Sequence, residues 1–90
     1  MSADNNETLL EFPCEFDIKA FGRHGTSFEQ VVYKLVKAHV PELTTDDLSS
    51  RESRGGRYIA VTASINAKSK AQLDAIYQDL TDSGQVLMSL

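Results

Sequence analysis

The sequence predicts an α+β domain in which two helices cover one face of a four-stranded antiparallel sheet. Two segments have apolar residues at helical spacing, and other segments alternate strictly between apolar and polar residues. Each strand has one apolar face and each helix one apolar stripe, so the helices bury their stripes against one side of the sheet. The predicted order is strand, helix, strand, strand, helix, strand, with the first and third strands central, which is the ferredoxin-like sandwich.

The first strand and first helix are predicted in the amino-terminal half. Residues 15–21 alternate, with Phe16, Ile18 and Ala20 on one face, and Gly22 ends the strand. A helix follows, because Thr26 with Glu29, or Ser27 with Gln30, has capping-box spacing and Pro41 stops the chain from continuing. The stripe of this helix is Phe28, Val31, Val32, Leu35, Val36 and His39.

A hairpin is predicted around Gly55-Gly56, a pair suited to the positive φ angles of a tight turn. Its second arm is the clearest strand, with Ile59, Val61, Ala63 and Ile65 toward the helices and Tyr58, Ala60, Thr62 and Ser64 away from them. Its first arm, residues 48–54, is polar. This composition indicates an edge strand that water or a partner chain can reach.

The second helix is predicted to begin at Ser69, which forms a capping box with Gln72, and to end at Gly84. Its stripe is Leu73, Ile76, Tyr77 and Leu80. In the terminal strand, Val86, Met88 and Leu90 alternate with Leu87 and Ser89, and we expect Val86 and Met88 to face the helices.

The predicted core combines the apolar faces of these elements: Phe16, Ile18, Ala20, Phe28, Val31, Val32, Leu35, Val36, Ile59, Val61, Ala63, Ile65, Leu73, Ile76, Leu80, Val86 and Met88. The other sheet face is then open and carries Asp17, Lys19, Phe21, Tyr58, Ala60, Thr62, Ser64 and Leu87. Such a face is either solvated or paired with another subunit, so a monomer and a homodimer both fit.

Residues 1–8 are expected to form a flexible polar tail, and residues 9–90 a single domain. The net charge of −4 argues against a general nucleic-acid or anionic-membrane binder. The single cysteine, Cys14, has no internal disulfide partner, and no apolar run approaches the ~20 residues that span a bilayer. We therefore expect a soluble cytoplasmic domain.

Several short segments resemble a known family: Leu10-Glu11-Phe12-Pro13, the strand to Gly22, Gly56-Arg57-Tyr58, Ile65-Asn66-Ala67, and Tyr77 with Leu80. In this order and at these separations they resemble the YbeD-like family of small bacterial proteins of unknown function, over residues 9–90. The resemblance implies a ferredoxin-like fold akin to ACT regulatory domains, which bind small metabolites. It implies no established activity and no site residues.

A candidate ligand site lies at the predicted connection between the first strand and the first helix. It consists of Gly22, Arg23, His24, Gly25 and Thr26. Free N–H groups and the dipole at a helix N-terminus favour an anion, Arg23 adds charge, and the glycines allow close approach. The alternative is that these residues form only a glycine-bounded turn that joins the strand to the helix and bind no ligand.

A candidate partner-binding site lies on the predicted hairpin and consists of Arg51, Arg54, Arg57 and Tyr58. Arginines at this density can bind phosphate or the acidic surface of a partner. The alternative is that they protect an exposed edge and pair with Glu52.

RNA recognition is a weaker hypothesis, because glycine and Val61 stand where the stacking aromatics of an RNA-recognition third strand belong. No Ser/His/Asp or Cys/His set, P-loop or dinucleotide fingerprint is present, and neither histidine has a second ligand at metal spacing. We expect no enzyme activity and no cofactor. The sequence favours a non-catalytic regulatory or adaptor domain that binds a small anionic metabolite at residues 22–26, or alternatively a protein partner along residues 48–54.

Overall fold

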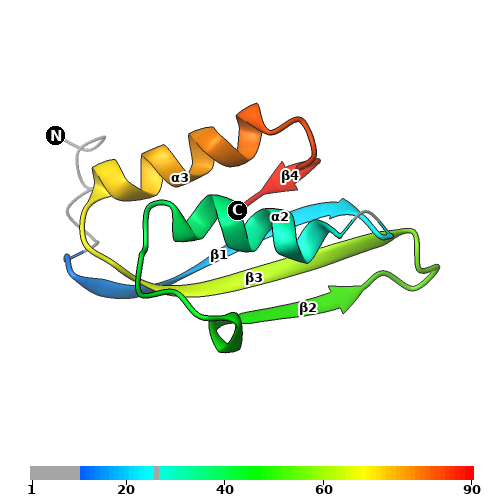
Figure 1. The fold of residues 1–90 in the computed structure, drawn as a ribbon, viewed down its shortest axis with the longest axis horizontal. Helices are drawn as coiled ribbons and strands as arrows, with labels where there is room; N and C mark the ends of the chain where they lie inside the picture. Colours follow the sequence, from blue (N-terminus) through cyan, green and yellow to red (C-terminus); the bar gives the residue numbers. More distant parts are fainter. Residues whose placement is uncertain (1–10, 26) are drawn as a thin grey trace, which may run out of the picture.

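The computed structural model describes residues 11–25 and 27–90. It has the predicted element order, with one 3-10 turn added (Figure 1): β1 (Cys14–Arg23), α2 (Phe28–Lys37), η2 (Thr45–Asp47), β2 (Leu48–Glu52), β3 (Tyr58–Ala67), α3 (Lys70–Asp82) and β4 (Met88–Ser89). The predicted tail, residues 1–8, and Thr26 of the candidate ligand site lie outside the described residues.

The sheet has the order β2-β3-β1-β4, so β1 and β3 are central as predicted. These two strands pair antiparallel along their whole length, from Cys14 opposite Ala67 to Arg23 opposite Tyr58. β2 lies at one edge and the two-residue β4 at the other (Figure 1).

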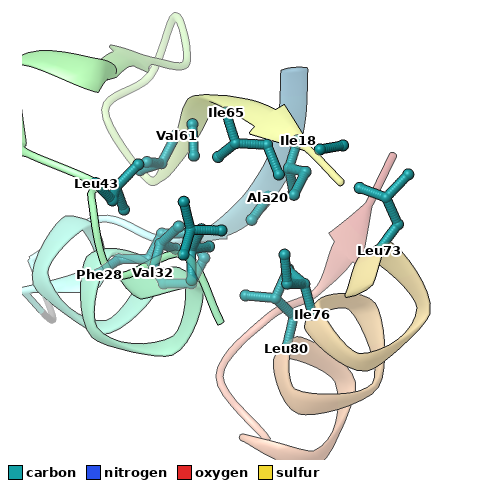
Figure 2. Packing of buried hydrophobic residues seen from close by; sticks show 14 residues of the cluster. Ile18, Ala20, Phe28, Val32, Leu43, Val61, Ile65, Leu73, Ile76 and Leu80 are labelled. Carbon is teal, nitrogen blue, oxygen red and sulfur yellow. The ribbon is translucent and has the colours of Figure 1, made fainter. Parts of the chain in front are cut away.

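Both helices pack against one face of this sheet, and the predicted strand parity is confirmed. Ile18 and Ala20 of β1 stand opposite Ala63 and Val61 of β3, and all four are fully buried. Figure 2 shows Val32 of α2 and Leu80 of α3 on the same side of the sheet as Ile18 and Ala20. Three further core residues were not predicted: Val40, Leu43 and Ala67.

β1 extends beyond its predicted end. Gly22 is not a terminator but a buried strand residue opposite Ile59. The Phe28 ring lies where a side chain on Gly22 would project, and a β-carbon there would overlap the ring. Glycine therefore provides space for Phe28, and the strand continues to Arg23.

The two helices begin in different ways. Ser27 is the N-cap of α2, but it has φ 57° and its side chain makes no capping bond; the Gln30 N–H bonds instead to the Ser27 carbonyl at 3.0 Å. The predicted Ser27–Gln30 capping box is therefore wrong. Ser69 does cap α3, since its Oγ accepts from the Gln72 N–H at 3.1 Å. Gly84, with φ 75°, follows the end of α3 as predicted.

The prediction that Met88 belongs to the core is wrong, because Met88 is 53% exposed. β4 pairs Ser89 with the buried Ala20 and Met88 with Phe21, so Met88 lies on the open face. Four of the five residues 86–90 are apolar, and alternation therefore could not indicate which ones face the core. Val86 does pack against the core.

No helix within the described ranges combines the length and the apolar character that crossing a membrane requires.

Candidate functional site

The two candidate sites predicted from the sequence meet at one corner of the molecule, where His24 contacts the β2–β3 hairpin. The His24 main-chain N–H donates to the Arg57 carbonyl at 2.9 Å. Its ring Nδ1 lies 3.1 Å from the Gly56 carbonyl oxygen, and Nε2 lies 3.1 Å from Glu52 Oε2. Both ring nitrogens therefore point at oxygen atoms of the hairpin.

The residues predicted to bind an anion are only partly brought together. His24 and Gly25 line a hollow of about 290 Å³ at the start of α2, but Glu29 lines it as well. Arg23 lines a different depression, with Gly84 and Leu87. Since Gly22 is buried under Phe28, the described part of the predicted set presents no convergent positive charge.

The predicted partner-binding residues are all exposed but do not form one patch. Arg51 lines a depression on the open sheet face with Lys19 and Phe21, whereas Arg54 and Arg57 lie in the hairpin loop. The loop is closed by the Ser53 N–H, which donates to the Tyr58 carbonyl at 2.9 Å. Of the glycine pair, Gly56 has a positive φ of 73° and Gly55 does not.

β2 is an edge strand, as its polarity predicted. It pairs with β3 along one side only, and its residues after Leu48 are all exposed. The Ser53 N–H points toward β3, and main-chain N–H groups alternate in direction along an antiparallel strand. The N–H and C=O groups of Ser50 and Glu52 consequently point away from the sheet, whereas the Leu48 N–H donates to the Thr45 carbonyl of the preceding 3-10 turn.

A hollow of about 270 Å³ with mainly apolar walls lies beside this edge. Its lining comes from α2 (Glu29, Gln30 and Tyr33) together with Thr45 and Leu48. Tyr33 is held in place: its hydroxyl lies 3.4 Å from the Leu43 carbonyl oxygen, and the Lys37 ammonium lies 5.6 Å from its ring centre. The Lys37 ammonium also donates to the Leu43 carbonyl at 2.8 Å.

The sequence did not indicate this hollow. Tyr33 lies outside the predicted apolar stripe of its helix, and Leu48 is the single large apolar residue of its strand. Only the packing of α2 beside β2 makes them neighbours.

Other polar pairs connect elements of the fold. His39 Nε2 lies 2.6 Å from Asp79 Oδ2, and the Gln72 side-chain amide donates to the His39 carbonyl at 2.9 Å. These contacts join the segment after α2 to α3. Within residues 11–25 and 27–90, no three His, Cys, Asp or Glu side chains are grouped closely enough to hold a metal ion.

The element order and the four-stranded antiparallel sheet with both helices on one face place this chain among small α+β sandwich domains of ferredoxin-like topology. Residues 7–90 match the family model described as "Protein of unknown function (DUF493)". The chain is 42% identical to a UPF0250 protein of Nitrosomonas europaea over 84 residues, covering 93% of this chain and 97% of that one. It is 40% identical over 88 residues to a UPF0250 protein of Chromobacterium violaceum, covering 98% of this chain and 99% of the relative.

The chain therefore belongs to the DUF493 family, and the resemblance to YbeD-like proteins is confirmed. The solution structure of HP0495 from H. pylori is similar with a TM-score of 0.71 and 13% identity, covering 100% of this chain and 94% of that one. At this identity the likeness shows the fold alone, and it confirms the predicted ferredoxin-like class.

Proposed function

We propose that this chain is a non-catalytic adaptor domain that binds an extended segment of a partner protein along the outer edge of β2. The observation that carries the proposal is Leu48, which belongs both to the unpaired edge and to the apolar hollow beside it. A peptide that adds a strand to an exposed edge gains main-chain hydrogen bonds, and pockets for its alternate side chains give specificity.

The register defines which side chain of the partner enters the hollow. Leu48 stands opposite the buried Ala63, so its side chain is on the helix side of the sheet. A partner residue paired with Leu48 points to that same side, next to Tyr33 and Gln30. The bound segment therefore carries an aliphatic or aromatic residue at this position.

The positive charges near the hairpin predict the orientation of the bound partner segment along β2. Arg54 and Arg57 lie in the hairpin loop that follows β2, at the end of the strand away from Leu48. Complementary charge across an interface fixes register and raises the association rate. We therefore expect carboxylates in the part of the partner that lies nearest the hairpin.

An anionic metabolite at residues 22–26 has less support than a peptide at the edge. Glu29 lines the hollow at the start of α2, Glu52 already contacts His24, and Arg23 lines another depression. Negative charge close to the helix N-terminus opposes the binding of a second anion.

The test is a selection of short random peptides on phage, followed by fluorescence anisotropy with the enriched peptides. Ser50→Pro removes an N–H that points away from the sheet, a position at which edge strands tolerate proline. Leu48→Ala removes a wall of the hollow. We expect each substitution to weaken binding by about tenfold or more, the equivalent of about 1.4 kcal/mol.

Ser49→Ala is the matched control, because the Ser49 side chain lies on the open face and its N–H points toward β3. This variant should bind like the wild type. Circular dichroism establishes that Ser50→Pro is folded, and Leu48→Ala tests the site without a backbone change. Enrichment of no peptide, or equal binding by all variants, would contradict the proposal.

A further inference from the structure

The open face of the sheet has an ordered pattern of charge that the proposed peptide edge does not use. Asp17 lies near one end of β1, where it lines a depression with Glu15 and Asp47. Arg23 lies at the other end of the strand, and Arg51 of β2 lies near that end, opposite Ala60. The face is thus acidic at one end and basic at the other.

The middle of this face has apolar or small side chains around one cation, Lys19. It contains Phe21, Ala60 and Thr62 of the central strands, and Met88 pairs with Phe21 from β4. Leu90 exchanges main-chain hydrogen bonds with Lys19, at 2.8 and 3.1 Å, which puts Leu90 on the same face. Tyr58, Met88 and Leu90 are 43%, 53% and 63% exposed. Such a band of exposed apolar side chains, bordered by charge, is typical of an interaction surface.

We propose that the occupant of this face is a second copy of the chain, docked face to face about a two-fold axis. The axis lies between the two sheets, perpendicular to the strands, and passes over the row formed by Ala20 and Val61, which stand opposite each other. This rotation reverses the strand direction, so it places the acidic end of each copy over the basic end of the other.

The register of the strands then gives the contacts. Asp17 meets Arg23 of the second copy, because each is three residues from Ala20. Lys19 meets Phe21, a cation over an aromatic ring, and Met88 meets Leu90. A rotation about an axis parallel to the strands would instead place the acidic end of one copy over the acidic end of the other, and basic end over basic end. Charge therefore selects one of the two symmetric arrangements.

The size of the face agrees with a weak dimer. Strands about 4.8 Å apart that rise about 3.3 Å per residue give the four strands together a planar extent of roughly 430 Å², which side-chain relief increases. This is about half of the ~800 Å² that a standard interface buries on each partner, so we expect the dimer to dissociate at low concentration. The outer edge of β2 is not part of this contact, so a dimer remains able to bind a peptide.

The test measures molar mass by light scattering and by sedimentation equilibrium over a range of concentrations. The wild type is expected to approach twice the chain mass of 9.9 kDa as concentration rises. Asp17→Arg and Arg23→Asp should each weaken the dimer at least about tenfold, since each puts like charges together. The double variant D17R/R23D restores opposite charges and should recover the dimer.

Lys34→Asp is the control, because Lys34 is exposed on α2, on the other side of the sheet, and the change in charge equals that of Arg23→Asp. It should leave the dimer intact. Met88→Ser provides a second disruption that alters no charge. A monomer at every concentration would overturn the proposal, and so would a dimer that both single charge reversals leave unchanged.

Discussion

Gly22 is a residue whose small size is required by its neighbour. It is the last but one residue of the central strand β1, opposite Ile59 and directly under the Phe28 ring. Phe28 is only 2% exposed and is the first residue of α2. The contact between them fixes how α2 starts over β1, and so indirectly positions the hollow that Tyr33 lines further along this helix.

Gly22→Ala should destabilise the fold by about 1–3 kcal/mol, because a buried methyl group would force the Phe28 ring to move. Gly55→Ala is the matched control, since an added β-carbon there meets no atom within 4 Å and Gly55 has no positive φ. Urea denaturation compares the two. Equal stability of the two variants would contradict this packing.

Tyr77 couples α3 to the last strand. Its hydroxyl donates to the Leu90 main-chain oxygen at 2.6 Å, and partial burial raises its pKa above the ordinary value of 10.0. The folded chain therefore holds this proton more tightly than the unfolded chain does. The resulting stability is fully present below about pH 10 and is lost as the pH rises beyond it.

Tyr77→Phe should lower the free energy of unfolding by about 0.5–1.5 kcal/mol near neutral pH, through loss of the hydrogen bond. The difference between wild type and variant should shrink above about pH 10, because only the wild type has the phenol to ionise. Urea denaturation at a series of pH values measures it, with the more exposed Tyr58→Phe as control. A difference that stays constant or widens at alkaline pH would contradict the linkage.

At the scale of elements, the helices differ in what starts them. Ser69 has an extended backbone and caps α3 with its hydroxyl, whereas Ser27 is left-handed and its side chain caps nothing in α2. Both serines had suitable spacing in the sequence. Capping-box spacing alone does not fix the backbone angles of the N-cap residue, and a side-chain cap accompanies the extended conformation that only Ser69 adopts.

Ser69→Ala should destabilise the protein by about 0.5–2 kcal/mol through loss of the cap, and Ser27→Ala should have little effect. Thermal denaturation followed by circular dichroism makes the comparison under one set of conditions. A loss as large in Ser27→Ala as in Ser69→Ala would show that the assigned caps are wrong.

Elements with strict periodicity could be predicted from the sequence, and elements without it could not. β3 alternates over its full length, and the side chains of Val61 and Ile65 face the helices as predicted. In the segment 86–90 four of the five residues are apolar, so the register of β4 depended on pairing with β1. Leu43 lies among polar residues, outside every element that periodicity predicts, yet its side chain is buried, and Tyr33 and Lys37 contact its carbonyl oxygen.

The candidate sites, too, could be predicted from the sequence only where they depend on local residue patterns. The edge strand could be predicted because the polarity of residues 48–54 is a local property. The hollow beside it arises from the placement of α2, a tertiary relation that spacing does not contain. Residues 22–25 are only partly brought together, because β1 runs two residues further than its alternation indicated and Arg23 lines a different depression from His24.

Besides the short edge at β4, the described part of the sheet presents two unpaired surfaces, the outer edge of β2 and the face opposite the helices. Their chemistry differs. The edge has main-chain donors and acceptors beside an apolar hollow, which suits an extended peptide, while the face has opposite charges at its two ends, which suits a second copy. A dimer formed through the face leaves both copies of the edge accessible, and two weak peptide sites in one particle would increase avidity.

The most direct measurement of the central proposal is amide hydrogen exchange along β2, read residue by residue by NMR. In the free protein, the Ser49 and Arg51 amides should be protected and those of Ser50 and Glu52 should exchange rapidly. A selected peptide, added at saturation, should slow exchange at these last two amides by about tenfold or more. Unchanged exchange along β2, with new protection at residues 22–28 instead, would contradict the proposal that the peptide binds along the outer edge of β2.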